Sequence, residues 1–171
     1  MTDAIAEHWM GNRFNGPYQR DHLMDHGVFV ETVETVETVE TVETATTWDN
    51  LENLYWTVKT ALSDAMGKGW VQCHISHLED GGASLYYTFM ATGESDALAQ
   101  WRRVKTAASQ AMIDAGGTIT HHHAVGTDHR PWIDDEIGDG GIRILRAIKT
   151  EFDPAGVLNP GKLIPEEGSH R

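Results

Sequence analysis

Residues 71–89 read Val-Gln-Cys-His-Ile-Ser-His-Leu-Glu-Asp-Gly-Gly-Ala-Ser-Leu-Tyr-Tyr-Thr-Phe. Side chains alternate along both halves, and the Glu-Asp-Gly-Gly segment at 79–82 is a turn sequence. The pattern predicts two antiparallel strands, the first with Val71, Cys73, Ile75 and His77 on one face. In the second strand Leu85, Tyr87 and Phe89 share a face, which leaves Tyr86 on the other. A hairpin is therefore the expected centre of the fold.

Helical periodicity flanks this hairpin on both sides. Apolar residues follow helical spacing at 51–65, at 98–115 and at 142–148, and an amphipathic stretch at 4–14 opens the chain. The first of the three internal helices is expected to start near Thr46 and Asp49 and to end at Gly67. The second starts at Ser95 and Asp96 and ends at Gly116 and Gly117. The third starts near Asp139 and ends at Asp153 and Pro154. The expected fold class is α+β, with helices backing an antiparallel sheet.

A low-complexity tract precedes these elements. Val-Glu-Thr occurs five times in tandem from Val30 to Thr44. A period of three matches neither a strand nor a helix, so no single face would hold all the valines. Because Val and Thr are β-branched, extended structure is favoured. We expect an over-long or looped-out strand that carries no site.

Composition limits the classes of function. The chain has 171 residues and a net charge of −13, which fits one domain and argues against binding to nucleic acid. No apolar stretch approaches the roughly 20 residues that cross a bilayer, and the N-terminus lacks a signal-peptide pattern. The single cysteine, Cys73, excludes an internal disulfide and falls on an apolar strand face, which predicts a buried, inert thiol. A cytoplasmic location fits these features.

The most conspicuous polar motif is His121-His122-His123. In an extended segment from Thr118 to Val125, His121 and His123 would point one way and His122 the other. Two such imidazoles can bind a divalent metal when another residue adds a ligand, and they can equally serve as acid or base. The further ligands that the sequence offers are His77, Asp128 and His129. Residue chemistry alone leaves both interpretations open.

Two other side chains could take part in chemistry. Tyr86 is either a packing residue or, beside an acid or base, a proton-transfer group. Arg20 is either a surface arginine or a clamp for phosphate or carboxylate. The sequence holds no glycine-rich phosphate loop, so we expect no nucleotide-binding element of its own.

Three segments together resemble the alkyldihydroxyacetonephosphate synthases. Residues 16–25, Gly-Pro-Tyr-Gln-Arg-Asp-His-Leu-Met-Asp, are similar to their arginine-bearing segment, and 73–89 is similar to their central hairpin. Residues 116–126, with the triple histidine, and 153–163, Asp-Pro-Ala-Gly-Val-Leu-Asn-Pro-Gly-Lys-Leu, resemble their C-terminal end. These synthases are flavoproteins of the vanillyl-alcohol-oxidase type. The resemblance makes residues 1–171 a C-terminal FAD-linked oxidase (cap) domain with a repeat insertion at about 30–44, and the N-terminal FAD-binding domain is absent from the match.

The resemblance implies an FAD-dependent enzyme that exchanges the acyl group of acyl-dihydroxyacetone phosphate for a fatty alcohol, forming an ether lipid precursor. It assigns catalysis to Tyr86 and to the histidines His121, His122 and His123. Arg20 would bind the substrate phosphate, and Asn159 and Lys162 would approach the cofactor, FAD. Because it favours acid/base histidines, no metal ligand is assigned. The expected partners are the missing FAD-binding domain and a small anionic or lipid-phosphate substrate, with a homodimer as an option.

Two further functions stay open. An FAD-linked oxidase or dehydrogenase of a 2-hydroxy acid would use Arg20 for the carboxylate and the histidines for the hydroxyl proton. Alternatively, the chain is an inactive fragment or a docking subunit for a separate FAD domain. Peripheral association with membranes is an alternative to a purely cytoplasmic location.

Overall fold

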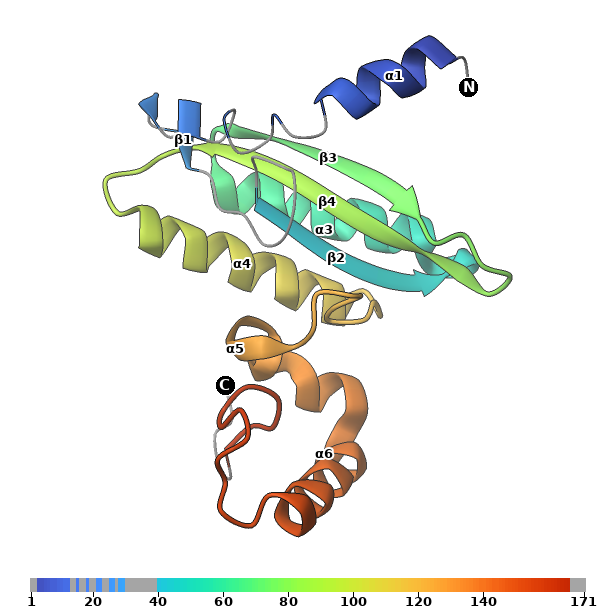
Figure 1. Cartoon of the computed structure of the whole chain (residues 1–171), viewed down its shortest axis with the longest axis vertical. Helices are drawn as coiled ribbons and strands as arrows, with labels where there is room; N and C mark the ends of the chain where they lie inside the picture. The colour runs from blue at the N-terminus through green and yellow to red at the C-terminus, as the bar shows by residue number, and fades with distance from the viewer. Residues whose placement is uncertain are drawn as a thin grey trace.

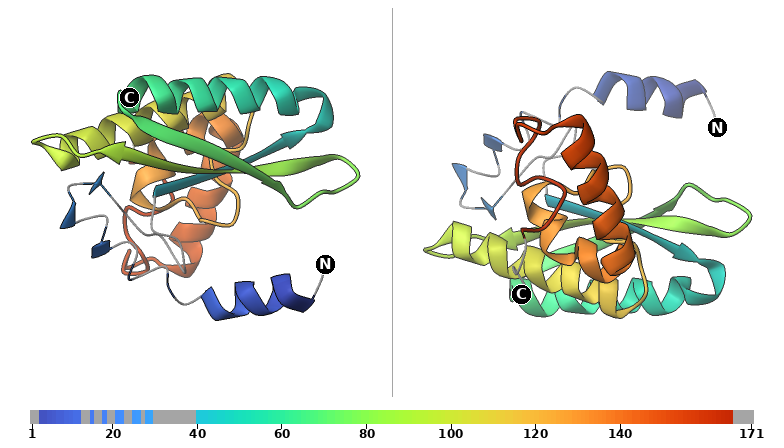
Figure 2. Two further views of the ribbon diagram at one scale, coloured as in Figure 1. Left: turned by 90° about the horizontal axis from the view of Figure 1, so that it is seen from above. Right: turned by 90° about the horizontal axis from the view of Figure 1, so that it is seen from below.

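The computed structural model describes residues 3–12, 15, 18, 21–22, 25–26, 28–29 and 40–166. In chain order the elements are α1 (Asp3–Asn12), β1 (Val28–Phe29), β2 (Glu40–Thr47), the 3₁₀ helix η1 (Trp48–Asn50), α3 (Leu51–Met66), β3 (Gly69–Ser76), β4 (Gly82–Thr92), α4 (Ala97–Asp114), α5 (Gly126–His129), η2 (Arg130–Trp132) and α6 (Ile133–Phe152). Helices α3 and α4 lie on one side of the sheet and α1 on the other, while α5, α6 and the tail form a lobe beyond α4 (Figures 1 and 2).

Strand β4 is the centre of the sheet. It pairs antiparallel with β3 along one edge, and with β2 and the short β1 along the other. The β3–β4 hairpin and the α+β class are thus as the sequence predicts. Leu85 and Tyr87 have no exposed surface, because their face of β4 packs against α3 and α4. The main core holds these side chains together with Leu54, Val58, Leu62, Phe89, Val104, Ala108 and Met112.

Helices α3 and α4 follow their predicted caps with one difference. Asp96 caps α4, since its Oδ1 accepts a hydrogen bond from the Ala99 amide at 2.9 Å. Gly67, with φ of +74°, ends α3. The predicted cap at Thr46 is wrong, however, because Thr46 is still part of β2 and α3 begins only after η1.

The C-terminal lobe contains more helix than the sequence pattern predicts. Helix α6 begins at Ile133 and bends at Gly138, whose φ of +67° is outside the helical region. The helical segment predicted at 142–148 lies after this bend. Buried Ile119, Trp132, Ile133 and Ile142 form a second, smaller core under this lobe. Within the described part of the chain, no helix combines the length and the apolar character that a membrane span needs.

Candidate functional site

Three polar side chains form one row across the sheet face opposite α3 and α4. Tyr86 on β4 is the register partner of Glu43 on β2 and of His74 on β3. Directly opposed residues of antiparallel strands project from the same face, so the three side chains are neighbours. The Tyr86 hydroxyl donates a hydrogen bond to Thr41 Oγ1 at 3.2 Å. Tyr86 therefore lies on the face that the sequence predicts, away from the core.

The histidine segment is held along β2 by the residues that precede it. Gly116 and Gly117 end α4 with a Schellman motif, in which the Gly117 amide donates to Met112 O at 2.8 Å. The Thr118 amide then donates to Ala45 O at 3.0 Å, and Thr44 Oγ1 donates to Thr118 O at 2.6 Å. These bonds fix where the histidines begin, next to Thr44 and Ala45 of β2.

The segment is not extended at the histidines themselves, and this part of the prediction is wrong. The His123 amide donates to His121 O at 2.9 Å, and His122 and Ala124 adopt φ angles of +66° and +61°. Left-handed residues reverse the chain locally, so strict alternation of side chains is lost. The rings of His121 and His122 stack at 4.1 Å, while His123 turns toward β4.

Glu43 links the histidines to the sheet. Its side chain is only 4% exposed, with Oε1 at 3.4 Å from His121 Nδ1 and Oε2 at 3.5 Å from His123 Nε2. A carboxylate oxygen only accepts hydrogen bonds, so Glu43 can receive one from a ring N–H of His121. Glu43 belongs to the last Val-Glu-Thr repeat. The expectation of a tract without site residues therefore fails at this position.

His123 and Tyr86 are in direct contact. Their rings meet edge to face, with centroids 5.6 Å apart and planes at 81°. His77 approaches the other two histidines from the loop after β3, with centroids 5.2 Å from His121 and 4.4 Å from His122. His77 and His121 also border a cavity of about 520 Å³ between the hairpin turn and the end of β2. The structure thus brings together Tyr86 and all three histidines of the motif.

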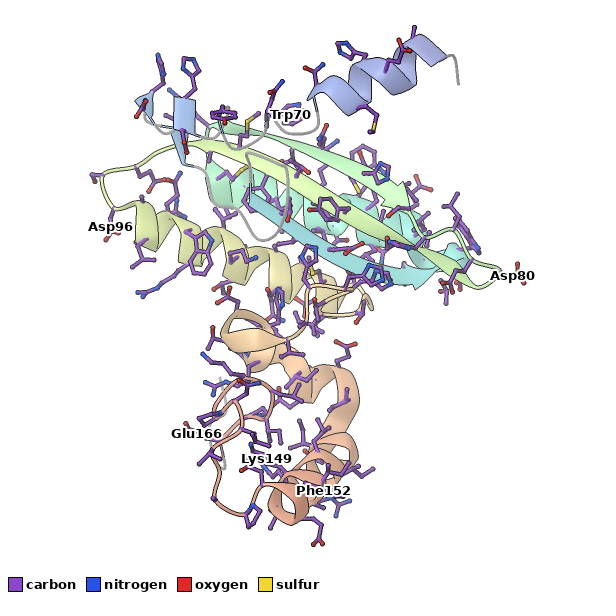
Figure 3. The ribbon with its side chains drawn as sticks, viewed as in Figure 1. Trp70, Asp80, Asp96, Lys149, Phe152 and Glu166 are labelled. Atoms are coloured by element: carbon purple, nitrogen blue, oxygen red, sulfur yellow. The ribbon has the colours of Figure 1, made fainter. Side chains whose placement is uncertain are left out.

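The predicted cofactor contacts lie in the lobe rather than on the sheet. Asn159 and Lys162 line a cavity of about 730 Å³ between α6 and the tail, bordered by Ala124–Gly126 directly after the histidines. Asp153 holds this tail, because its carboxylate accepts from Lys149 and from the Val157 and Leu158 amides at 3.0 and 2.9 Å. The Lys149 hydrogen bond holds the pKa of Asp153 below its usual value. In Figure 3 Lys149 lies in this lobe, remote from Asp80 at the tip of the hairpin.

Arg20 falls outside the described residues. Sequence reasoning missed Glu43 because the repeat hides it: nothing distinguishes it from the other four glutamates of the tract until its register opposite Tyr86 is known. His77 was named only as a potential metal donor, and its proximity to the motif depends on the hairpin turn.

Comparisons with known proteins place the chain in a family. Residues 17–163 match the family described as FAD linked oxidases, C-terminal domain. Alkyldihydroxyacetonephosphate synthase of Dictyostelium discoideum is 34% identical over 170 residues, 96% of this chain and 26% of the relative. The synthase of Trypanosoma brucei brucei is 29% identical over 169 residues, 95% of this chain and 26% of the relative. A solved alkyldihydroxyacetonephosphate synthase structure matches 92% of this chain and 25% of its own length, with a TM-score of 0.58 and 26% identity.

The chain therefore spans about a quarter of the length of these relatives. The family match covers nearly all of the sheet, the histidine segment and the tail. It assigns FAD as the cofactor of the family and implies an FAD-binding domain as partner. The chain belongs to the FAD-linked oxidases as a C-terminal domain, and its resemblance within them is to the alkyldihydroxyacetonephosphate synthases.

Proposed function

We propose that this chain is the substrate-side part of an FAD-dependent enzyme that exchanges the acyl group of acyl-dihydroxyacetone phosphate for a fatty alcohol. The observation that carries the proposal is the contact of Tyr86 with His123, with Glu43 behind the histidine. A phenol and an imidazole in contact form an acid/base pair. The names of the relatives supply the reaction class.

The exchange requires proton transfers that this pair can perform. A proton leaves the carbon beside the substrate carbonyl, and the C–O bond to the acyl carboxylate breaks. The alcohol oxygen then forms the new C–O bond as it loses its own proton, and a proton returns to the carbon, so that the net exchange releases the carboxylate and one proton. His123 and Tyr86 are the groups we assign to these transfers, while Glu43 holds the imidazoles in a fixed tautomer and orientation. Arg20 is proposed to bind the substrate phosphate because of its sequence context alone.

The residues present fit one side of a flavin site. Imidazole and phenol groups on the sheet face are donors and acceptors that suit the polar edge of a flavin ring, and Tyr86, His123 and His74 would be the groups that meet it. FAD would supply the electron-accepting ring. The described residues contain no glycine-rich turn between a strand and a helix, so the dinucleotide itself would be held by the partner domain. Asn159 and Lys162 are proposed to meet that domain.

We propose that the enzyme meets its alcohol substrate at a membrane surface, because a long-chain alcohol partitions into bilayers. The protein would associate peripherally.

The test is a chimera in which residues 17–163 replace the matching C-terminal segment of the Dictyostelium synthase. We expect FAD binding and formation of the alkyl product from acyl-dihydroxyacetone phosphate and hexadecanol. Tyr86→Phe should lower kcat by about 10²–10⁴-fold, the range for loss of an acid/base group. An FAD-loaded chimera without exchange activity would contradict the proposal.

Tyr87→Phe is the matched control. Tyr87 is adjacent in sequence but points into the core, where its hydroxyl donates to Leu54 O and Tyr55 O. The variant should lose about 1 kcal/mol of stability and keep its kcat. Stoichiometric bleaching of the flavin by D-lactate, with no exchange, would instead support the 2-hydroxy-acid oxidase alternative.

A further inference from the structure

We propose that Glu43, His77, His121 and His122 form a binding site for a divalent transition metal, with Zn²⁺ as the best match. Each of the four residues offers one ligand atom, and these atoms all lie within 4.8 Å of one another. This assignment departs from the expectation that the histidines serve only as acid and base.

The geometry needs little adjustment to close around an ion. Zinc bonds of about 2.0–2.2 Å place tetrahedral ligand atoms about 3.4 Å apart. His121 Nδ1 and Glu43 Oε1 are already at 3.4 Å. The other two ligands are the exposed rings of His77 and His122, which can rotate without disturbing the core. The exposed rings can therefore move toward the ion while the buried carboxylate stays in place.

The donor set selects the class of metal. Three imidazoles and one carboxylate suit Zn²⁺, Co²⁺ or Ni²⁺, whereas Mg²⁺ and Ca²⁺ require mostly oxygen ligands. The net charge of −13 favours any cation over an anion. The cavity of about 520 Å³ that His77 and His121 border gives an ion a path from solvent.

Backbone strain in the cluster provides an independent observation. Among the described residues other than glycine, positive φ angles occur at His77 (+48°), His122 (+66°), Ala124 (+61°) and Asn159 (+44°). Two of these four are proposed ligands. Residues held in this region carry a conformational penalty, and such residues concentrate at sites where their side chains must converge. The rings of both residues lie beside His121, with centroids at 5.2 Å for His77 and 4.1 Å for His122.

The site leaves the proposed catalytic pair intact. His123 is not one of the four ligands and keeps its contact with Tyr86. Glu43 joins the two groups, because Oε1 faces His121 and Oε2 faces His123. A metal bound through one oxygen would leave the other for His123.

The experiment is a titration of the full chain with ZnCl₂ by calorimetry and with CoCl₂ by visible absorption, in the absence of FAD and substrate. We expect one equivalent, a dissociation constant on the order of 1 µM, and the intense bands of tetrahedral cobalt. Saturating zinc should also raise Tm. Because no activity is measured, the result is independent of the proposed function.

His77→Asn is the decisive variant, since asparagine tolerates positive φ while lacking the imidazole. It should weaken zinc binding at least about tenfold, as should Glu43→Gln. His74→Asn, at an exposed histidine of β3 outside the four proposed ligands, should leave binding unchanged. His22 and His26, whose rings lie 4.4 Å apart, are the rival site, and His26→Asn tests them. Unchanged affinity in His77→Asn, loss in His26→Asn, or no saturable binding would overturn the proposal.

Discussion

Glu43 on β2 and Tyr86 on β4 are register partners in the sheet. A buried carboxylate and a phenol therefore project side by side from the sheet face opposite α3 and α4. The histidine segment completes this arrangement, because His123 contacts both side chains. The proposed acid/base pair thus comes from β4 and one loop, and the carboxylate beside it comes from β2, in the repeat tract.

Glu43→Gln should lower kcat of the chimeric enzyme by about 10- to 100-fold with little change in KM. Glutamine keeps the size of the side chain but removes the charge that faces His121 and His123, so orientation of the imidazoles suffers and substrate contacts do not. Steady-state kinetics measures both constants. Glu52→Gln, an exposed change in the first turn of α3, is the control and should leave both unaltered. Equal kcat for the two variants would refute a positioning role.

Gly117→Ala should destabilise the protein by about 1–3 kcal/mol, because an added Cβ would lie 2.6 Å from Thr44 Oγ1 and 2.8 Å from a Leu54 methyl. Thr44 and Leu54 lie this close because the chain leading into the histidine segment packs directly against β2 and α3. Urea unfolding measures the change. Gly140→Ala is the control: its Cβ meets nothing within 4 Å, and alanine in a helix should stabilise by up to about 1 kcal/mol. Similar effects at both positions would contradict the close-approach argument.

The parts of the fold that the sequence predicts are those with a local cause. Alternation along β4 places Tyr86 and Tyr87 on opposite faces, and the Gly116-Gly117 pair ends α4, because each depends on a few neighbouring residues. The kink at Gly138 could not be predicted from neighbouring residues, since a glycine is compatible with a continuous helix as well as with a bend.

The sequence names candidate residues for the site, but it does not predict how they are arranged. The turn at His122 and Ala124 lies next to residues held by distant partners: Thr118 bonds to β2, and the Ile119 amide donates to the Glu136 carboxylate at 2.7 Å. Such long-range contacts leave no periodic signal. Glu43 illustrates the same limit, because its partners lie far along the chain.

Cys73 should react slowly with iodoacetamide at pH 8. Burial raises the pKa of its thiol to about 11, so the thiolate fraction is about two orders of magnitude below that of a free cysteine. Mass spectrometry of alkylated protein over time measures the rate. The same chain in guanidinium chloride is the reference and should react at the rate of an unfolded peptide. Equal rates in both conditions would show that the thiol is not sheltered by α3 and the sheet.

Stability should fall as the pH is lowered through the range below about 6.5, and His129 should contribute to that fall. His129 is buried, and its Nδ1 donates to Ala124 O at 3.1 Å. Burial lowers the pKa of His129, with Lys105 and His123 acting in the same direction and Asp128 and the Ala124 carbonyl opposing it. The unfolded chain therefore takes up a proton at a pH where the folded protein does not. The stabilisation is complete above the unfolded pKa and is lost as the pH falls toward the folded one.

His129→Gln removes this titration while the side-chain amide can still donate a hydrogen bond. The free energy of unfolding should then depend less on pH between 7 and 5, by up to about 1.4 kcal/mol per pH unit for one proton. Urea denaturation at a series of pH values measures the slope. Coincident curves for the parent and His129→Gln would show that this histidine is protonated equally in the folded and unfolded states.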